Sequence, residues 1–389
     1  MKRALLLALL CSACRDVPEL FTPGNPFEKD VSGRLTYNVR PDHAPVWAVD
    51  GDSIYYNAAT YPGFPTTEGM LLAVPRTGGT ATSIMNAVQT GQIRQPWVAG
   101  LALSADGGSA AFVEVTNHKL NEFDQLVCPF FPPPAVPQFD TLGTNAFLVG
   151  GLLRVRKLNS TNATDDAQLA IQFPGRTYNS SNQLVGITAH PFHRLFDIEG
   201  VPFFRPSFSP DGSRVVFSDG LNLRLWTIGQ TTSTVIANTA DGIMPAWSPD
   251  GTLIAFSKPK RGGTQTIGCQ GRLNGVVLPL ATPTKTIYTP VSREDGSLFV
   301  IRPDGTGLRA VGEGDSPAWL SDSKTVVAHR LFALHRINTD TGLGTAIPNT
   351  TDGFEAALSR DNKMLSFARR TPFNGNEFIG TYDIWAATF

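Results

Sequence analysis

The sequence has few charged side chains and no marked excess of either sign. Charged residues make up 17% of its 389 residues, and the formal net charge is −1. A chain without a basic excess or a run of like charge lacks the electrostatic footprint that binds nucleic acid, so we expect no nucleic-acid partner. The hydrophobic share of 41% and the aromatic share of 10% exclude an intrinsically disordered chain.

The N-terminal segment is apolar but too short to span a bilayer. A basic region, Met1-Lys2-Arg3, precedes an apolar stretch from Ala4 to Leu10. A short basic region, a short apolar region and small residues in this order are typical of a signal peptide. We therefore expect residues 1–13 to be a signal peptide.

The residues that end this segment resemble a bacterial lipobox. Ser12 and Ala13 precede Cys14, and Cys11 stands where the pattern usually has leucine. The resemblance implies lipidation at Cys14, and plain secretion is the alternative. Residues 14–33 are rich in proline and lack hydrophobic periodicity, so we expect a tether. The protein would then lie in the cell envelope, in the periplasm or at the outer membrane, and touch the membrane only through its lipid anchor.

Cysteine is scarce, with four in the chain. Removal of the signal peptide leaves two in the body, Cys128 and Cys269. An even pair in an oxidising compartment favours a disulfide, and two separate thiols are the alternative.

Sequence motifs of common catalytic sites are missing. The chain has no G-x-S-x-G elbow, no H-E-x-x-H pair and no phosphate-binding loop. His190 and His193 flank a proline without a neighbouring cluster of carboxylates, which makes a metal site there improbable. We therefore predict no catalytic residues, no metal and no cofactor.

Glycine and proline, in contrast, are abundant at 37 and 29 residues, and they belong to a repeat. An aromatic or apolar residue is followed three positions later by Asp and often then by Gly. The six copies are Trp47–Gly51, Leu103–Gly107, Phe208–Gly212, Trp247–Gly251, Trp319–Ser323 and Leu358–Asn362. Because Asp bonds local N–H groups and Gly tolerates positive φ, each copy predicts a tight turn between two strands.

The spacing of the copies predicts six blades. Two further strands follow each turn, which gives the four antiparallel strands of a propeller blade. The last unit ends at Phe389 after its third strand, and the segment 34–39 is strand-like. We expect this N-terminal strand to complete blade six and close the ring.

The Ser-Pro-Asp-Gly form of the motif, at Ser209–Gly212 and Ser248–Gly251, resembles the TolB-like propeller repeat, a WD-like repeat of the Pro-Asp type. The resemblance extends over most of residues 34–389 and implies an all-β, six-bladed β-propeller. It implies function only loosely, because the repeat occurs in Tol-complex proteins, in peptidase propellers and in many lipoproteins.

Long insertions are expected after the second strand of four blades. This connection always emerges on one face of a propeller, and elaborated loops on one face usually carry recognition. The expected insertions are 57–69 in blade one, 116–146 in blade two, 258–296 in blade four and 369–381 in blade six.

Residues just ahead of each inner strand should line the mouth of the central channel. The candidate binding residues are His43, Phe204, Arg205, Met244, Asp315, Phe354 and Glu355. Arg205 and Glu355 come from opposite blades and could grip a charged ligand, although rim charges are more often merely solvated.

These observations favour a binding or scaffolding protein of the cell envelope, monomeric, whose insertion-bearing face recognises a protein or a glycan. The alternative is a stand-alone propeller enzyme, a lyase or glycoside hydrolase with its site at the channel mouth.

Overall fold

Strands make up the regular structure of this chain. The computed structural model describes residues 32–37, 42–58, 70–86, 97–119, 125–127, 147–158, 166–171, 176–178, 184–187, 205–259, 264–268, 270–273, 276–277, 284–288, 296–373 and 376–389. Across these ranges, no helix has the length and apolar character that a membrane crossing requires.

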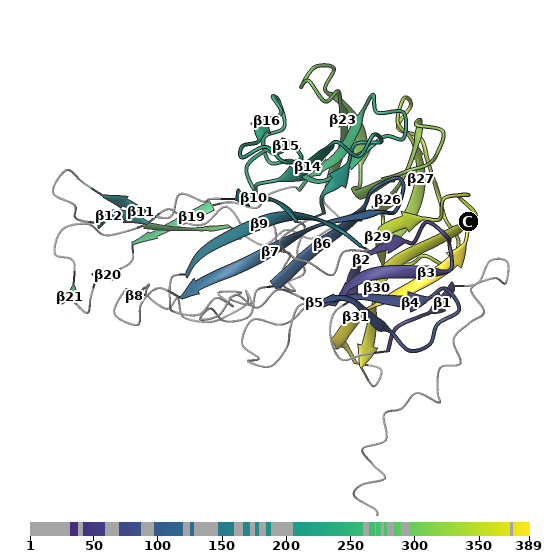
Figure 1. The fold of residues 1–389 in the computed structure, drawn as a ribbon, viewed down its shortest axis with the longest axis horizontal. Coiled ribbons are helices and arrows are strands. Elements are labelled where there is room, and N and C mark those ends of the chain that lie inside the picture. Colours follow the sequence, from purple (N-terminus) through teal and green to yellow (C-terminus); the bar gives the residue numbers. More distant parts are fainter. Residues whose placement is uncertain are drawn as a thin grey trace, which may run out of the picture.

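Six four-stranded antiparallel sheets form the blades of a β-propeller (Figure 1). Blades one to three are β2 (Asp42–Trp47), β3 (Ser53–Ala58), β4 (Met70–Pro75), β5 (Thr82–Asn86); β6 (Trp97–Leu103), β7 (Ser109–Lys119), β9 (Phe147–Lys157), β10 (Ala167–Ile171); and β13 (Ser207–Phe208), β14 (Arg214–Ser218), β15 (Leu223–Thr227), β16 (Thr234–Val235). Blades four to six are β17 (Ile243–Trp247), β18 (Ile254–Lys258), β23 (Ser297–Ile301), β24 (Arg309–Glu313); β25 (Asp315–Trp319), β26 (Thr325–Arg330), β27 (Ala333–Asn338), β28 (Gly344–Ala346); and β29 (Gly353–Leu358), β30 (Met364–Phe373), β31 (Asn376–Thr388), β1 (Ser32–Arg34). The predicted fold class is confirmed.

The N-terminal strand closes the ring, but at a different place from that expected. β1 covers Ser32–Arg34 rather than 34–39, and it pairs with β31 as the outer strand of blade six. The last backbone bond of this ladder runs from Leu35 N–H to the Ile384 carbonyl. At Thr36 the side-chain hydroxyl, and not the main chain, accepts the Ile384 N–H at 2.9 Å. The strand ends there because its ladder partner is a side chain.

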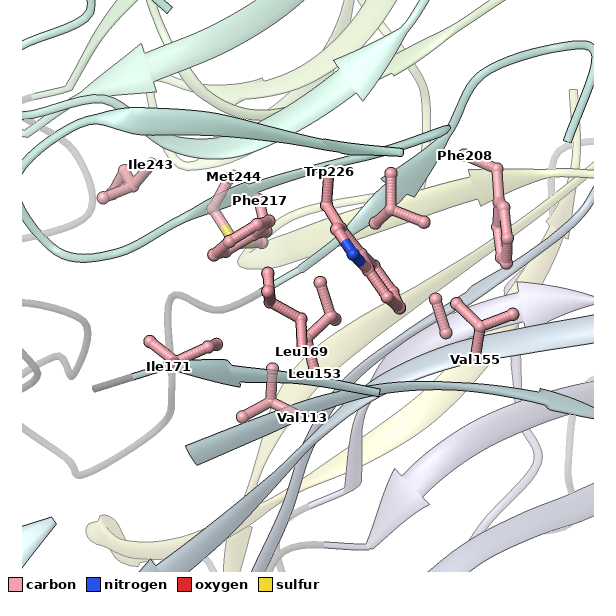
Figure 2. Packing of buried hydrophobic residues seen from close by; sticks show 12 residues of the cluster. Val113, Leu153, Val155, Leu169, Ile171, Phe208, Phe217, Trp226, Ile243 and Met244 are labelled. Atoms are coloured by element: carbon pink, nitrogen blue, oxygen red, sulfur yellow. The ribbon is translucent and has the colours of Figure 1, made fainter. Parts of the chain in front are cut away.

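Six hydrophobic clusters of the described residues hold neighbouring blades together, and they follow the ring from blade one to blade six and back to blade one. Figure 2 shows the cluster between blades two and three. Val113 and Leu153 of blade two face Phe217 and Trp226 of blade three. Since every blade shares buried side chains with both neighbours, each interface helps to keep the ring closed.

The repeated aspartates make the expected turns between the first two strands. Asp50, Asp106, Asp211, Asp250, Asp322 and Asp361 each accept the backbone N–H two residues later. In four turns a serine two residues earlier donates its hydroxyl to the aspartate. The next residue has a φ between 53° and 76° in all six turns and is glycine in four of them, as at Gly212 (φ 70°).

The expected insertions differ in kind. Those of blades one, two and four separate the second and third strands, at 59–69, 120–146 and 259–296. The expected insertion of blade six at 369–381 is wrong, because β30 and β31 continue through it as one long hairpin with Thr371 opposite Thr381. Only Asn374 and Gly375 stand between the two strands, and Asn-Gly favours a two-residue hairpin turn.

Candidate recognition face and channel mouth

The two faces of the propeller are made of different connections. The connections from second to third strands and from each blade to the next lie on one face, which we name the insertion face because it carries 59–69, 120–146 and 259–296. The six aspartate turns lie on the opposite face, the turn face. A rigid ring thus presents its longest chain segments on one side, where binding residues commonly occur.

Additional strands project from the insertion face. β8 (Gln125–Val127) comes from the insertion of blade two, and β20 (Gln270–Leu273) comes from the insertion of blade four. They pair antiparallel with Val127 opposite Gln270. β21 (Val276–Val277) extends this sheet to three strands. The insertions of blades two and four therefore join each other.

Two further pairs of strands belong to the insertions and connections of this face. β19 (Thr264–Gly268) pairs with β22 (Thr284–Tyr288), and β11 (Arg176–Tyr178) pairs with β12 (Leu184–Ile187). β12 contacts β22, so the connection between blades two and three also joins this part of the face. In Figure 1, β11, β12 and β19 lie at the left of the view. The β11–β12 hairpin was not predicted from the sequence, since its segment carries no copy of the repeat.

The inner strands share a backbone irregularity at the expected channel mouth. Five of them have a β-bulge at which one residue adopts positive φ: Ala44 (50°), Gly100 (66°), Met244 (50°), Ser316 (51°) and Glu355 (53°). The sequence carries a signal for this irregularity. Proline follows the bulged residue at Pro45, Pro245 and Pro317, and proline inside a strand is confined to edges and bulges.

Glu355 of blade six is buried, at 1% exposure, and is not a solvated rim charge. Its carboxylate accepts the backbone N–H of Ala44 in blade one at 2.7 Å. His43 is equally buried, and its Nδ1 lies 3.9 Å from Glu355 Oε2. The bulge of blade one is thus held by a side chain of blade six, where the ring closes.

Arg205 of blade three reaches the same two blades. Its guanidinium donates to the Ala356 carbonyl of blade six at 3.0 Å and to the Pro45 carbonyl of blade one at 3.3 Å. Because blades three and six stand opposite each other in a ring of six, this side chain crosses the central axis. Burial lowers the pKa of Arg205, and the Glu355 carboxylate opposes that shift. The Arg205 guanidinium therefore bridges the mouth and is bound to main-chain oxygens of blades six and one.

The other candidate residues are dispersed. Met244 packs in the cluster between blades two and three, and Phe354 packs edge-on against Tyr382 at 4.9 Å. Asp315 is buried opposite His329 on the neighbouring strand. Among the described candidates, His43, Arg205 and Glu355 are brought together. The remaining candidates, Phe204, Cys14, Cys128 and Cys269, lie outside the described residues. Across the part of the chain that the structure describes, no group of three or more His, Cys, Asp or Glu side chains could hold a metal ion.

The class that the ring and its turns define is a six-bladed β-propeller. No protein-family profile matches the sequence, and no curated protein matches it.

Solved propellers are similar in fold. TolB from Acinetobacter baumannii is 13% identical at a TM-score of 0.48, covering 88% of this chain and 65% of that one. An oligogalacturonate lyase in complex with manganese is 12% identical at 0.46, covering 92% and 79%. A gluconolactonase from Xanthomonas campestris is 11% identical at 0.48, covering 92% and 89%. The chain spans 65% of the TolB chain's length. Likenesses this distant concern the fold and carry no argument about activity.

Proposed function

We propose that this chain is a binding or scaffolding protein of the cell envelope whose insertion face recognises a protein or a glycan. The observation that carries the proposal is the pairing of β8 with β20. Segments that the repeat does not require are joined into a sheet of their own, at one side of a rigid ring. Insertions joined in this way give the ring one continuous surface, as a specific interface requires.

The state of the channel mouth supports recognition on the face rather than chemistry in the centre. The two charges opposed across the ring, Arg205 and Glu355, are engaged with main-chain groups of neighbouring blades. A general acid or base must instead reach a substrate, within hydrogen-bond distance or through one water.

The N-terminal segment supports a place in the envelope. A signal peptide over 1–13, lipidation of Cys14 and a tether would hold the ring near a membrane through a lipid anchor alone. Labelling with a fatty-acid probe should mark the wild-type protein and not Cys14→Ser. Equal labelling of both proteins would refute the anchor and leave the recognition face to be tested separately.

The recognition face is tested by shortening one insertion. Lys119 and Phe147 are opposed in the β7–β9 ladder, so Asn-Gly can replace residues 120–146 without changing the register. The full chain, the shortened chain and a turn-face control, Leu343→Asn, are compared by cross-linking in cells and by co-sedimentation with purified peptidoglycan sacculi. We expect the shortened chain alone to lose its cross-linked protein or its sacculus binding. Equal capture by all three chains would contradict the proposal.

A further inference from the structure

Blade five ends on the insertion face in a two-residue hairpin that is unusual in conformation and in composition. Arg330 pairs with Ala333, which leaves Leu331 and Phe332 as the whole turn. Both adopt positive φ, at 48° and 62°. Turns of this kind strongly favour Asn-Gly, because larger side chains are strained there. The two side chains are also 63% and 54% exposed, so burial in the ring does not offset the strain.

The equivalent connection in blade three shows what an ordinary turn at this place looks like. There Asp219 accepts the backbone N–H groups of Leu221 and Asn222, and the positive φ falls on Gly220. The carbonyl of Leu221 accepts the Asp241 N–H, as the carbonyl of Phe332 accepts the Asp352 N–H. The two connections thus share this hydrogen bond, but of the two only that of blade five places two large hydrocarbon side chains at positive φ.

We propose that the Leu331–Phe332 tip is an anchor through which the insertion face binds an apolar pocket on a protein partner. This inference rests on the proposed function and narrows its partner to a protein. Strained and exposed residues at a loop tip are a recognised mark of binding sites, and a few apolar or aromatic anchors usually dominate a protein interface.

The chemistry of the tip favours a protein over the other occupants. Neither side chain carries a hydrogen-bonding group, which recognition of a glycan requires. Two side chains fill a pocket, whereas lipid binding scales with a larger buried apolar area.

The first test separates stability from binding. In the full chain, the double substitution Leu331→Asn with Phe332→Gly supplies the preferred turn and should raise the Tm by about 2–4 °C. The matched control is Leu343→Asn, at a leucine 75% exposed in a turn of the same blade on the turn face, and it should leave the Tm unchanged. A fall in Tm for the double variant would show that Leu331 and Phe332 serve the fold, and would overturn the inference.

The second test identifies the occupant. A benzophenone amino acid replaces Phe332, or Leu343 as control, in the full chain in cells. We expect one discrete protein adduct from position 332, none from 343, and at least a roughly tenfold loss of that adduct when Leu331→Asn is added. An adduct with lipid or glycan, equal adducts at both positions, or no adduct at 332 would overturn the inference.

The chain that lacks residues 120–146 separates the proposed function from the proposed anchor. Capture that is lost on shortening but insensitive to Leu331→Asn would leave the proposed function standing and refute the anchor. An adduct at 332 that persists in the shortened chain and is lost with Leu331→Asn would support the anchor and contradict the proposed function.

Discussion

Single side chains supply much of the bonding that makes each blade regular. The repeated aspartates act locally. Each one accepts hydrogen bonds from its own turn and so closes it. At Asp211 the carboxylate accepts the hydroxyls of Ser209 and Ser213 and the Ser213 N–H. These bonds lower its pKa from an ordinary 3.8 to about 2. The turns are therefore more stable with the aspartate ionised.

Stability should accordingly depend on the protonation of Asp211. Because the pKa of Asp211 is lower in the folded than in the unfolded state, its ionised carboxylate stabilises the fold at pH values above the unfolded pKa. This contribution is lost as the pH falls through the folded pKa of about 2. Asp211→Asn keeps an acceptor and loses the charge, so the difference in unfolding free energy between wild type and variant should shrink between about pH 4 and pH 2. Denaturant titrations across this range measure it. A difference that stays constant would contradict the assignment.

The aromatic residue of the repeat packs between blades. Trp247 is 6% exposed, lies in the cluster shared by blades three and four, and donates its backbone N–H to the Ser207 hydroxyl. Trp247→Ala should cost about 3–5 kcal/mol of unfolding free energy, as expected for a buried large aromatic. Leu343→Ala, at an exposed site, should change it by less than about 0.5 kcal/mol. An unchanged Tm for Trp247→Ala would refute this packing.

At the scale of elements, the closing strand is held by an ion pair as well as by its ladder. Arg34 of β1 lies 2.9 Å from Asp383 of β31, whose side chain is fully buried. Arg34→Met should cost about 3–5 kcal/mol, since the buried Asp383 carboxylate loses this ion pair. Arg76→Met, which breaks the exposed contact with Asp52, should cost less than about 1 kcal/mol. Equal small losses in chemical unfolding would show that this pair does not hold the strand.

Two further elements bear on the predicted disulfide. β8 ends at Val127 and β20 begins at Gln270, and these two residues are opposed. Cys128 follows Val127 in the sequence and Cys269 precedes Gln270, and the disulfide between them stays a prediction. Peptide mapping of the secreted protein without reduction should yield the Cys128–Cys269 peptide, and Cys128→Ser should yield one free thiol. Two titratable thiols in the native wild type would refute the bridge.

At the scale of the whole molecule, the fold could be predicted because the same turn-forming motif occurs six times in the sequence. Asp and Gly at a fixed distance from an aromatic specify a turn, and the aromatic specifies an interface, so the ring follows. The bulges were not predicted, since four of the five bulged residues are not glycine and reach positive φ under tertiary constraint. The hairpin of blade six was missed although Asn374-Gly375 signalled it.

The candidate site was harder to predict than the fold. Position along the repeat places His43, Arg205 and Glu355 near the axis, but not their hydrogen-bond partners, which belong to other blades. Met244 and Phe354 share that position and pack into clusters instead, because a bulge turns its neighbours toward different surroundings. The pairing of β8 with β20 joins segments more than a hundred residues apart, which no local pattern reports.

The central claim is that recognition takes place on the insertion face. Hydrogen–deuterium exchange of the full chain, with and without the partner identified by cross-linking, tests it most directly. We predict protection in β8, β19, β20, β22 and the hairpin around Leu331 and Phe332, with no change in the turns around Asp211, Asp250 and Asp361. Protection confined to those turns, or to the inner strands around Arg205 and Glu355, would contradict the account.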